Sequence, residues 1–183
     1  MFFTISKKMK ELTIATDFSG INAPLHALDK MNIKYKLIFS CDNDIHCKKQ
    51  ILAHHAPICF FDDIKDTKTR LNHFPPEGYI DIYVSSMPCQ PYSGLTNRST
   101  LEEKNSKIQG NTELLKHVLF TIRKLRPKVA IFENVALFKR EPDYDTLIKS
   151  MKRYKYDVYS EILNSKDYGI PQLRRRVYII YVK

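Results

Sequence analysis

The segment with the clearest chemical potential is residues 88–91, which read Pro-Cys-Gln-Pro. A cysteine thiolate is a strong nucleophile, and the prolines on either side of Cys89 restrict the backbone that directs its thiol. The alternative is that Cys89 is inert filler of the core, the usual role of a lone cysteine. The segment follows a predicted strand over residues 80–84, and ligands of open α/β sheets gather at the carboxyl ends of strands. This position favours a nucleophile.

Two further groups of polar side chains also follow or enter predicted strands. Glu133 follows a strand predicted over residues 129–132, and one role for a partly buried glutamate there is to stay protonated and donate a proton or hydrogen bond to a ring nitrogen. Its alternative role is a carboxylate that neighbours a helix N-terminus. In a strand, Gln172, Arg174 and Arg176 would share one face, because side chains alternate. The alternative for this run is a solvated, basic start of a strand.

Residues 16–24 form a tight turn between the first predicted strand and the first predicted helix. Nucleotide-like cofactors meet a helix N-terminus at such a turn, although a turn with one glycine is weak evidence by itself. Asp42, near the end of the second predicted strand, is placed to accept hydrogen bonds from ribose hydroxyls. Asp63, after the third predicted strand, is placed to hold an adenine amino group.

The elements that must position these residues alternate along the chain. Short apolar, β-branched runs predict strands, and amphipathic stretches predict helices. The two final strands alternate in hydrophobicity and favour an antiparallel ribbon at one sheet edge. The pattern indicates an α/β fold of the class I methyltransferase (Rossmann-like) type: a doubly wound, mostly parallel sheet with an antiparallel edge strand. The predicted strands are 12–16, 35–39, 58–61, 80–84, 129–132, 156–163 and 176–182, and the predicted helices are 24–31, 45–53 and 112–125.

Residues 93–111 interrupt this alternation, because they are polar and carry few apolar anchors. A long loop inside a compact domain is usually functional or disordered, and this predicted loop directly follows the Cys89 segment.

Composition limits the classes of protein that fit. With 183 residues, 43% hydrophobic and 27% charged, the chain suits one domain and is neither disordered nor fibrous. No apolar run reaches about 20 residues, and no signal peptide is visible, so a cytoplasmic or nuclear protein is expected. Four cysteines without a Cys-x-x-Cys pair are expected to be free thiols, and no zinc-like spacing is present, so no metal is expected.

The net charge of +10 favours an anionic partner, most often nucleic acid, over a soluble basic protein without such a partner.

Taken together, these segments resemble the cytosine-C5 methyltransferases, which act on DNA and in one branch on tRNA. Residues 88–93 (Pro-Cys-Gln-Pro-Tyr-Ser) look like the nucleophile motif of the family, residues 133–135 like its Glu-Asn-Val motif and residues 172–176 like its Gln-x-Arg-x-Arg motif. The motifs occur in the family's order, and the resemblance runs from residue 14 to residue 182.

The resemblance implies a DNA (cytosine-5-)-methyltransferase that uses S-adenosyl-L-methionine. The target cytosine would be flipped out of the duplex, and Cys89 would attack its C6 to form a covalent adduct. Glu133 would engage N3 and the amino group, and Arg174 and Arg176 would bind the base O2 and a nearby phosphate.

The family's other sites carry over residue by residue. The cofactor pocket would be lined by Phe18, Gly20, Asp42, Asp63, Ile64 and Pro88. Nucleic acid would be contacted by Gln90, Ser93, Gln172, Arg174 and Arg176.

The sequence departs from the family pattern at Asn22, where the family usually has a second glycine. Asparagine tolerates the left-handed backbone, so the turn is expected to survive, with the side chain crowding the methionine end of the cofactor. Residues 85–87 (Ser-Ser-Met) replace the more usual Gly-Gly-Pro, with local effects only.

The resemblance covers the catalytic part, so residues 1–183 are expected to be a single cofactor-binding domain without a target-recognition region. One hypothesis is the catalytic subunit of a split DNA methyltransferase whose partner chain supplies recognition. The other is a truncated module, inactive or regulatory, that binds cofactor, nucleic acid or a partner without turnover. The intact Cys89, Glu133, Arg174 and Arg176 favour the first, and Asn22 favours the second. DNA is expected as substrate in preference to RNA.

Overall fold

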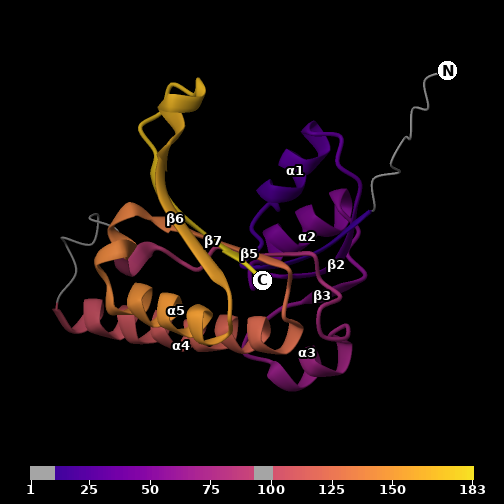
Figure 1. The fold of residues 1–183 in the computed structure, drawn as a ribbon, viewed down its shortest axis with the longest axis horizontal. Helices are drawn as coiled ribbons and strands as arrows, with labels where there is room; N and C mark the ends of the chain where they lie inside the picture. The colour runs from indigo at the N-terminus through magenta and orange to yellow at the C-terminus, as the bar shows by residue number, and fades with distance from the viewer. Residues whose placement is uncertain (1–10, 93–100) are drawn as a thin grey trace.

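The computed structural model describes residues 11–92 and 101–183, which fold around one mixed sheet (Figure 1). The described strands form a seven-stranded sheet in the order β3-β2-β1-β4-β5-β7-β6. Strand β7 runs antiparallel to both β5 and β6, and the remaining neighbours are parallel. The mostly parallel sheet with an antiparallel edge is therefore confirmed. The strands are β1 Leu12–Asp17, β2 Tyr35–Cys41, β3 Cys59–Phe61, β4 Ile82–Ser85, β5 Val129–Val135, β6 Asp157–Asn164 and β7 Arg175–Val182.

The strand order reverses at β1, because the chain builds β2 and β3 on one side of it and then returns to place β4 on the other. The register keeps the ends of the central strands level. Asp17 of β1 pairs with Cys41 of β2 and with Ser85 of β4, and Ser85 pairs with Phe132 of β5. The residues that follow these four therefore emerge at the same sheet edge, where α/β proteins bind ligands.

The helices that connect the strands are α1 Ala23–Lys30, α2 Ile45–His54, α3 Thr67–His73, α4 Leu101–Leu125 and α5 Pro142–Arg153, with short 3-10 turns η1 Gln90–Tyr92, η3 Ala136–Arg140 and η4 Ser165–Tyr168. Aspartates begin two of the helices, since Asp44 accepts hydrogen bonds from the backbone of α2 and Asp66 from that of α3. The sequence did not predict α3 or α5.

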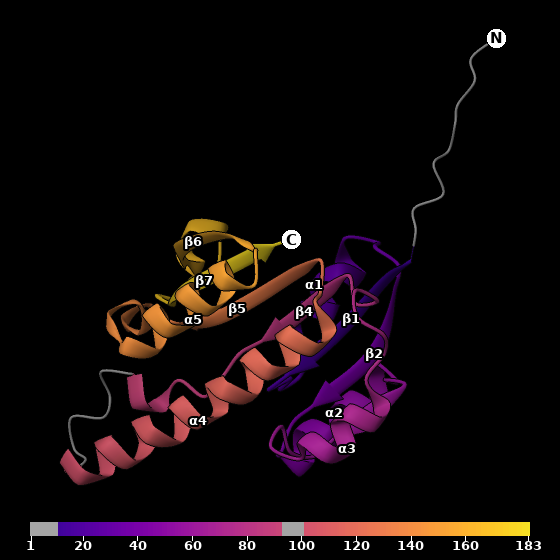
Figure 2. The same ribbon diagram turned by 60° about the horizontal axis from the view of Figure 1, so that its bottom comes forward.

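Helices cover the two faces of the sheet unequally. On one face, α4 and α5 lie side by side over the large hydrophobic core, as Figure 2 shows. On the other face, α1 packs on β1 and β2 through a small cluster of Ile14, Leu25 and Leu37. Because neighbouring strand residues face opposite ways, Ala15 and Ile38 belong to the large core while Ile14 and Leu37 belong to the small one.

The predicted loop over residues 93–111 is wrong in its second part. Residues 101–111 form the first turns of the long helix α4, while residues 93–100 lie outside the described residues. These turns begin with Glu102 and Glu103, which suit a helix N-terminus, and are mostly exposed. A helix without a buried face shows no apolar periodicity, which is why the sequence pattern suggested a loop.

Three further findings concern the cysteines, the helices and metal-binding side chains. All four cysteines are free thiols, as predicted. Among residues 11–92 and 101–183, no helix combines the length and apolar character needed to cross a membrane. The same residues hold no cluster of three or more histidine, cysteine or acidic side chains arranged for a metal ion.

Candidate active site

A cavity of about 330 Å³ lies at the sheet edge where β1, β2, β4 and β5 end. It collects most of the residues selected from the sequence, although they are far apart along the chain. The predicted residues that line it are Phe18, Gly20, Asp42, Pro88, Cys89, Gln90, Glu133, Arg174 and Arg176. The parallel register therefore brings Cys89, Glu133 and the turn after β1 into one place, and the antiparallel strand β7 adds the two arginines.

The remaining predicted residues lie elsewhere. Asp63 and Ile64 follow β3, next to the end of β2; Asp63 is exposed and Ile64 is buried. Gln172 is exposed in the turn before β7 and does not line the cavity, so the face expected for Gln172, Arg174 and Arg176 holds only the two arginines at the site. Ser93 lies outside the described residues.

Side chains from two helices and a strand hold the segment that carries Cys89. Asn111 of α4 donates from Nδ2 to the carbonyl of Pro88 at 2.5 Å, and Asn134 of β5 donates to the carbonyl of Met87 at 3.3 Å. Tyr92 donates its hydroxyl hydrogen bond to Asp143 of α5 at 2.5 Å. The thiol is half-buried beside the cavity. The segment is therefore anchored on both sides, and the Cys89 thiol stays accessible.

Sequence reasoning assigned no role to these anchors. Asn134 belongs to the Glu-Asn-Val motif, and Asn111 was included in the predicted loop. Both are buried, and each bonds a backbone carbonyl of the Cys89 segment. A polar residue inside a motif was the available signal for Asn134, whereas nothing in the sequence pattern distinguishes Asn111.

Glu133 faces the two arginines across the cavity. Its Oε1 lies 3.1 Å from Nε of Arg176 and 3.9 Å from Nη2 of Arg174. Burial raises the pKa of Glu133 above its usual value, and the charges of Arg176 and Arg174 oppose that rise. The raised pKa favours the protonated carboxyl, the form that can donate a hydrogen bond to a bound ring.

Strand β7 places the arginines. Arg176 pairs with Val135 of β5, and Arg174 lies two residues earlier, so both face the side of the sheet to which Glu133 points. Arg175 lies between them and is exposed. The guanidinium groups thus enter the site from a strand that runs opposite to β5.

The turn after β1 has an unusual backbone. Phe18, Gly20 and Asn22 adopt the left-handed region, with φ of 52°, 53° and 56°. The Gly20 N–H donates to Oδ2 of Asp42 at 2.8 Å, which joins the ends of β1 and β2. Because glycine adopts this conformation without strain, Gly20 suits the point where the turn approaches Asp42 most closely.

Asn22 does not crowd the cavity, contrary to the expectation from the sequence. Its side chain is fully buried: Oδ1 accepts a hydrogen bond from Thr16, and Nδ2 donates to Ser40, each at 3.0 Å. The amide therefore points into the protein, where polar partners from β1 and β2 satisfy it.

A second, larger cavity of about 670 Å³ continues from the site along the face of the sheet on which α1 packs. Ser86, Glu133 and Arg174 line both cavities. The rest of its lining is largely apolar and comes from α1, β4, β5 and β7, including Leu28, Ile82, Ile131 and Ile180. We call this second cavity the apolar groove.

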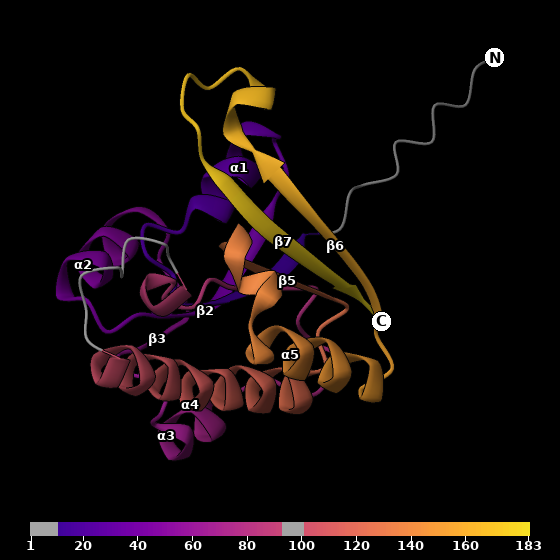
Figure 3. The same cartoon turned by 90° about the vertical axis from the view of Figure 1, so that its left-hand side faces the viewer.

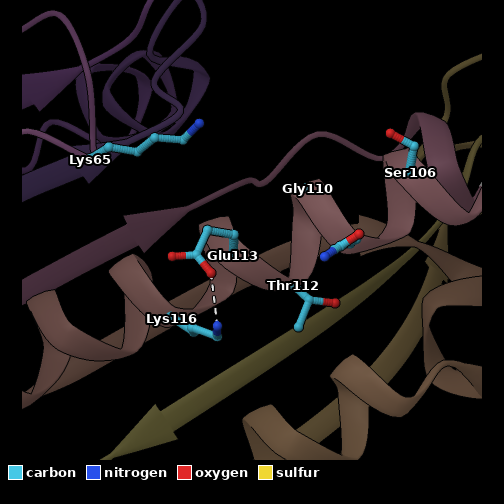
Figure 4. A pocket seen from close by; sticks show the side chains of 7 residues that line it. Lys65, Ser106, Gly110, Thr112, Glu113 and Lys116 are labelled. Atoms are coloured by element: carbon cyan, nitrogen blue, oxygen red, sulfur yellow. Dashed lines mark hydrogen bonds and ion pairs between the residues drawn. The ribbon is translucent and has the colours of Figure 1, made fainter.

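Figure 4 shows a different hollow, of about 450 Å³, between Lys65 and helix α4. It is bordered by polar residues, among them Thr112, Glu113 and Lys116, and Lys116 forms a 2.8 Å ion pair with Glu113. Neither Cys89 nor Glu133 lines it. We therefore place the candidate active site at the cavity that contains Cys89.

Comparison with known proteins gives one consistent family. The sequence profile of the C-5 cytosine-specific DNA methylases matches residues 13–183. The orphan methyltransferase M.Rho11sI of Bacillus phage rho11s is 29% identical over 181 residues, which are 96% of this chain and 34% of that protein. The type II methyltransferase M.NlaX of Neisseria lactamica is 26% identical over 170 residues, 89% of this chain and 50% of the relative.

The fold is similar to that of solved methyltransferases. The structure of the S. pombe Dnmt2 methyltransferase matches 94% of this chain and 50% of its own, with a TM-score of 0.72 and 18% identity. At this identity the likeness concerns the fold. The chain spans between a third and a half of the length of these three proteins.

Proposed function

This chain belongs to the C-5 cytosine-specific DNA methylases, and on that basis we propose that it transfers a methyl group from S-adenosyl-L-methionine to C5 of cytosine in DNA. The observation that carries the proposal is the meeting of Cys89, Glu133, Arg174 and Arg176 in one cavity with the turn after β1. Residues 1–183 would form the single catalytic domain, working where DNA is found, in the cytoplasm or the nucleus.

The residues suit a covalent mechanism. The Cys89 thiolate forms a bond from Sγ to C6 of a flipped cytosine, while protonated Glu133 donates to N3, so that the electron pair pushed into the ring is neutralised. C5 becomes nucleophilic and would bond to the methyl carbon, while the bond from that carbon to the sulfonium sulfur of the donor breaks with its electron pair, leaving S-adenosyl-L-homocysteine. Loss of the C5 proton to a base then returns electrons to the ring and expels Cys89 as thiolate. Arg174 and Arg176 hold the base O2 and a nearby phosphate.

The turn after β1 fits the cofactor, which supplies an electrophilic methyl group when bound. Phe18, Gly20 and Pro88 border the same cavity as the nucleophile, so a bound methyl donor and Cys89 would share one space. The Asp42 carboxylate at the end of β2 is a suitable acceptor for ribose hydroxyls. Asp63 and Ile64, after the neighbouring strand β3, would meet the adenine.

DNA would approach the site from the hairpin side. Gln90 and the two arginines border the cavity, and the exposed Gln172 lies in the turn that leads to Arg174. Ser93, which lies outside the described residues, is also proposed to contact nucleic acid. Positively charged side chains next to a flipped base position the phosphate backbone, and they carry no sequence information themselves.

Selection of the target sequence is proposed to come from a second chain that binds over the apolar groove. Tyr159, Ile180 and Val182 are exposed on this face of β6 and β7, with 60%, 39% and 37% of their surface accessible. Exposed apolar surface of this kind marks interaction sites. Because Glu133 and Arg174 line the same groove, a chain bound there would also touch the active site.

The decisive test is adduct trapping. DNA that contains 5-fluorocytosine is incubated with S-adenosyl-L-methionine and the protein, alone and with the product of the neighbouring gene. Fluorine at C5 cannot leave as a proton does, so the enzyme stays bound and migrates as a covalent complex on a denaturing gel. We expect a complex with the wild type and with Cys47→Ser, whose thiol does not line the cavity, and none with Cys89→Ser.

The same experiment decides between an enzyme and a binding module. The wild type could bind the cofactor and DNA and still form no covalent adduct with the DNA, whichever neighbouring gene product is added. In that case the chain is a non-catalytic methyltransferase-like module and the proposed reaction is wrong.

A further inference from the structure

A buried ion pair lies behind the turn that borders the active site. Nη2 of Arg70, in α3, is 2.8 Å from both carboxylate oxygens of Asp17, the last residue of β1. The Tyr83 hydroxyl of β4 donates to Oδ2 of the same carboxylate at 2.6 Å. Each of the three residues is 1% exposed, and none lines the cavity that contains Cys89.

Arg70 also reaches other segments. Its Nη1 donates to the carbonyl of Ile64, in the loop after β3, at 3.2 Å, and Nη2 donates to Thr121 of α4 at 3.3 Å. The guanidinium lies 5.3 to 5.7 Å from the ring centres of Phe39, Phe61 and Phe74. A planar group with donors on several sides is needed to make these bonds at once.

Stability alone does not explain a charged pair at this place. Desolvation of two buried charges is costly, and well-packed apolar side chains of similar volume are often as stabilising or more so. The surrounding phenylalanines already provide an apolar setting in which such side chains would pack. An ion pair at this place, unlike apolar side chains, fixes the relative positions of the segments that it bonds.

That geometry concerns the cofactor segments. Asp17 directly precedes Phe18, whose backbone is left-handed, and Ile64 directly follows Asp63. The carbonyl of Asp17 also accepts a hydrogen bond from the Ser86 N–H at 3.4 Å, in the segment that leads to Cys89. A single side chain is thus bonded to the residue next to the turn after β1 and to the loop after β3.

We propose that Arg70 is a positioning residue for the cofactor, whose guanidinium fixes the end of β1 and the loop after β3 at the spacing that S-adenosyl-L-methionine requires. The inference rests on the proposed function, because it assigns both segments to the cofactor pocket. Arg70 does not touch the cofactor; it acts through Asp17 and through the Ile64 carbonyl.

The first test compares arginine with lysine. Arg70→Lys keeps the charge but has one compact ammonium group, which cannot bond Asp17 and Ile64 in the same geometry. We expect the Kd for S-adenosyl-L-methionine, measured by calorimetry, to rise about tenfold. The matched control is Arg126→Lys at the end of α4, whose guanidinium packs on Tyr156 away from the site and whose change should leave the Kd unaltered.

A second variant separates positioning from stability. In Asp17→Leu/Arg70→Met both charges are absent, so no unpaired charge stays buried and the thermal midpoint should exceed that of Arg70→Met alone. The Kd should nevertheless remain about tenfold above that of the wild type, because nothing joins the two segments. Wild-type affinity in this double variant would overturn the proposal.

Hydrogen exchange distinguishes a positioning role of Arg70 from a general stabilising role. In the protein without cofactor, Arg70→Lys should accelerate exchange at residues 18–20 and at residues 63–65, and leave residues 147–151 of α5 unchanged. Equal acceleration everywhere would show that Arg70 only stabilises the fold and would overturn the inference. Failure of the wild type to bind S-adenosyl-L-methionine would instead contradict the proposed function.

Discussion

Two arginine–carboxylate groups lie at the same sheet edge. They share the same chemical groups but differ in burial and in hydrogen bonding. The Asp17–Arg70 pair is closed: the side chains are 0% and 2% exposed, and one guanidinium nitrogen contacts both carboxylate oxygens. The Glu133 group is open: its side chain is 21% exposed, and the two arginines approach only Oε1, at 3.1 and 3.9 Å.

The difference shows how burial separates an ion pair that is closed to ligands from one that is open to them. Asp17 has its oxygens occupied by Arg70 and Tyr83, so it holds the fold and offers nothing to a ligand. Glu133 lines a cavity, and burial raises the pKa of its carboxyl although Arg176 and Arg174 oppose the rise. The same chemical groups therefore serve opposite purposes near the carboxyl ends of β1 and β5.

The largest effect should come from breaking the closed pair. Asp17→Asn leaves the Arg70 charge buried without a counter-charge, and we expect a loss of about 3–5 kcal/mol in the free energy of unfolding. Urea denaturation measures it. The exposed pair Lys48–Asp62, with 30% and 70% of the side chains accessible, is the matched control, and Asp62→Asn should cost no more than about 1 kcal/mol. Similar losses in the two variants would contradict the distinction.

Glu133→Gln, in the open group, should lower activity strongly and change stability little. The amide has nearly the same shape but cannot supply a proton, so kcat for methyl transfer is expected to fall about 10²- to 10³-fold. The free energy of unfolding should change by no more than about 1 kcal/mol, because the group is partly solvated. Single-turnover methylation and urea denaturation give the two numbers. A variant that keeps full activity would remove Glu133 from the mechanism.

The smallest expected effect is the pH dependence that Glu133 gives to the free energy of unfolding. Because burial raises the pKa of Glu133 in the folded protein, the folded state binds more protons than the unfolded state between the ordinary and the raised pKa. Stability from this group is therefore present at lower pH and decreases as the pH rises through the raised pKa. The pH dependence of wild-type unfolding, minus that of Glu133→Gln, should show this slope. A difference of opposite sign would mean that the arginines outweigh burial.

The sheet and most of the site were predictable from the sequence for one physical reason. Parallel strands end at a common edge, so residues that follow apolar runs meet there regardless of their separation in the chain. Cys89, Glu133 and Asp42 were placed correctly in this way, and the alternation of β7 gave the shared face of Arg174 and Arg176.

The features that the sequence did not reveal depend on contacts between elements. Helix α3 escaped detection because the side chain it buries is Arg70, whereas pattern rules look for apolar residues. Helix α5 carries such a signal, because Leu147 and Met151 are buried four residues apart, yet the predicted helices do not include it. The inward direction of Asn22 depends on partners in β1 and β2, which only the fold brings together.

The β6–β7 hairpin has a mechanical consequence. Its tip projects beyond the sheet, as Figure 3 shows, and carries exposed apolar side chains, among them Leu173 at 80% accessibility. Pairing of β7 with β5 ends at Arg176, so Arg176 is held by β5 while Arg174 lies beyond the last pair, in the hairpin. A displacement of the hairpin tip would therefore change the distance from Arg174 to Glu133 more than the distance from Arg176 to Glu133.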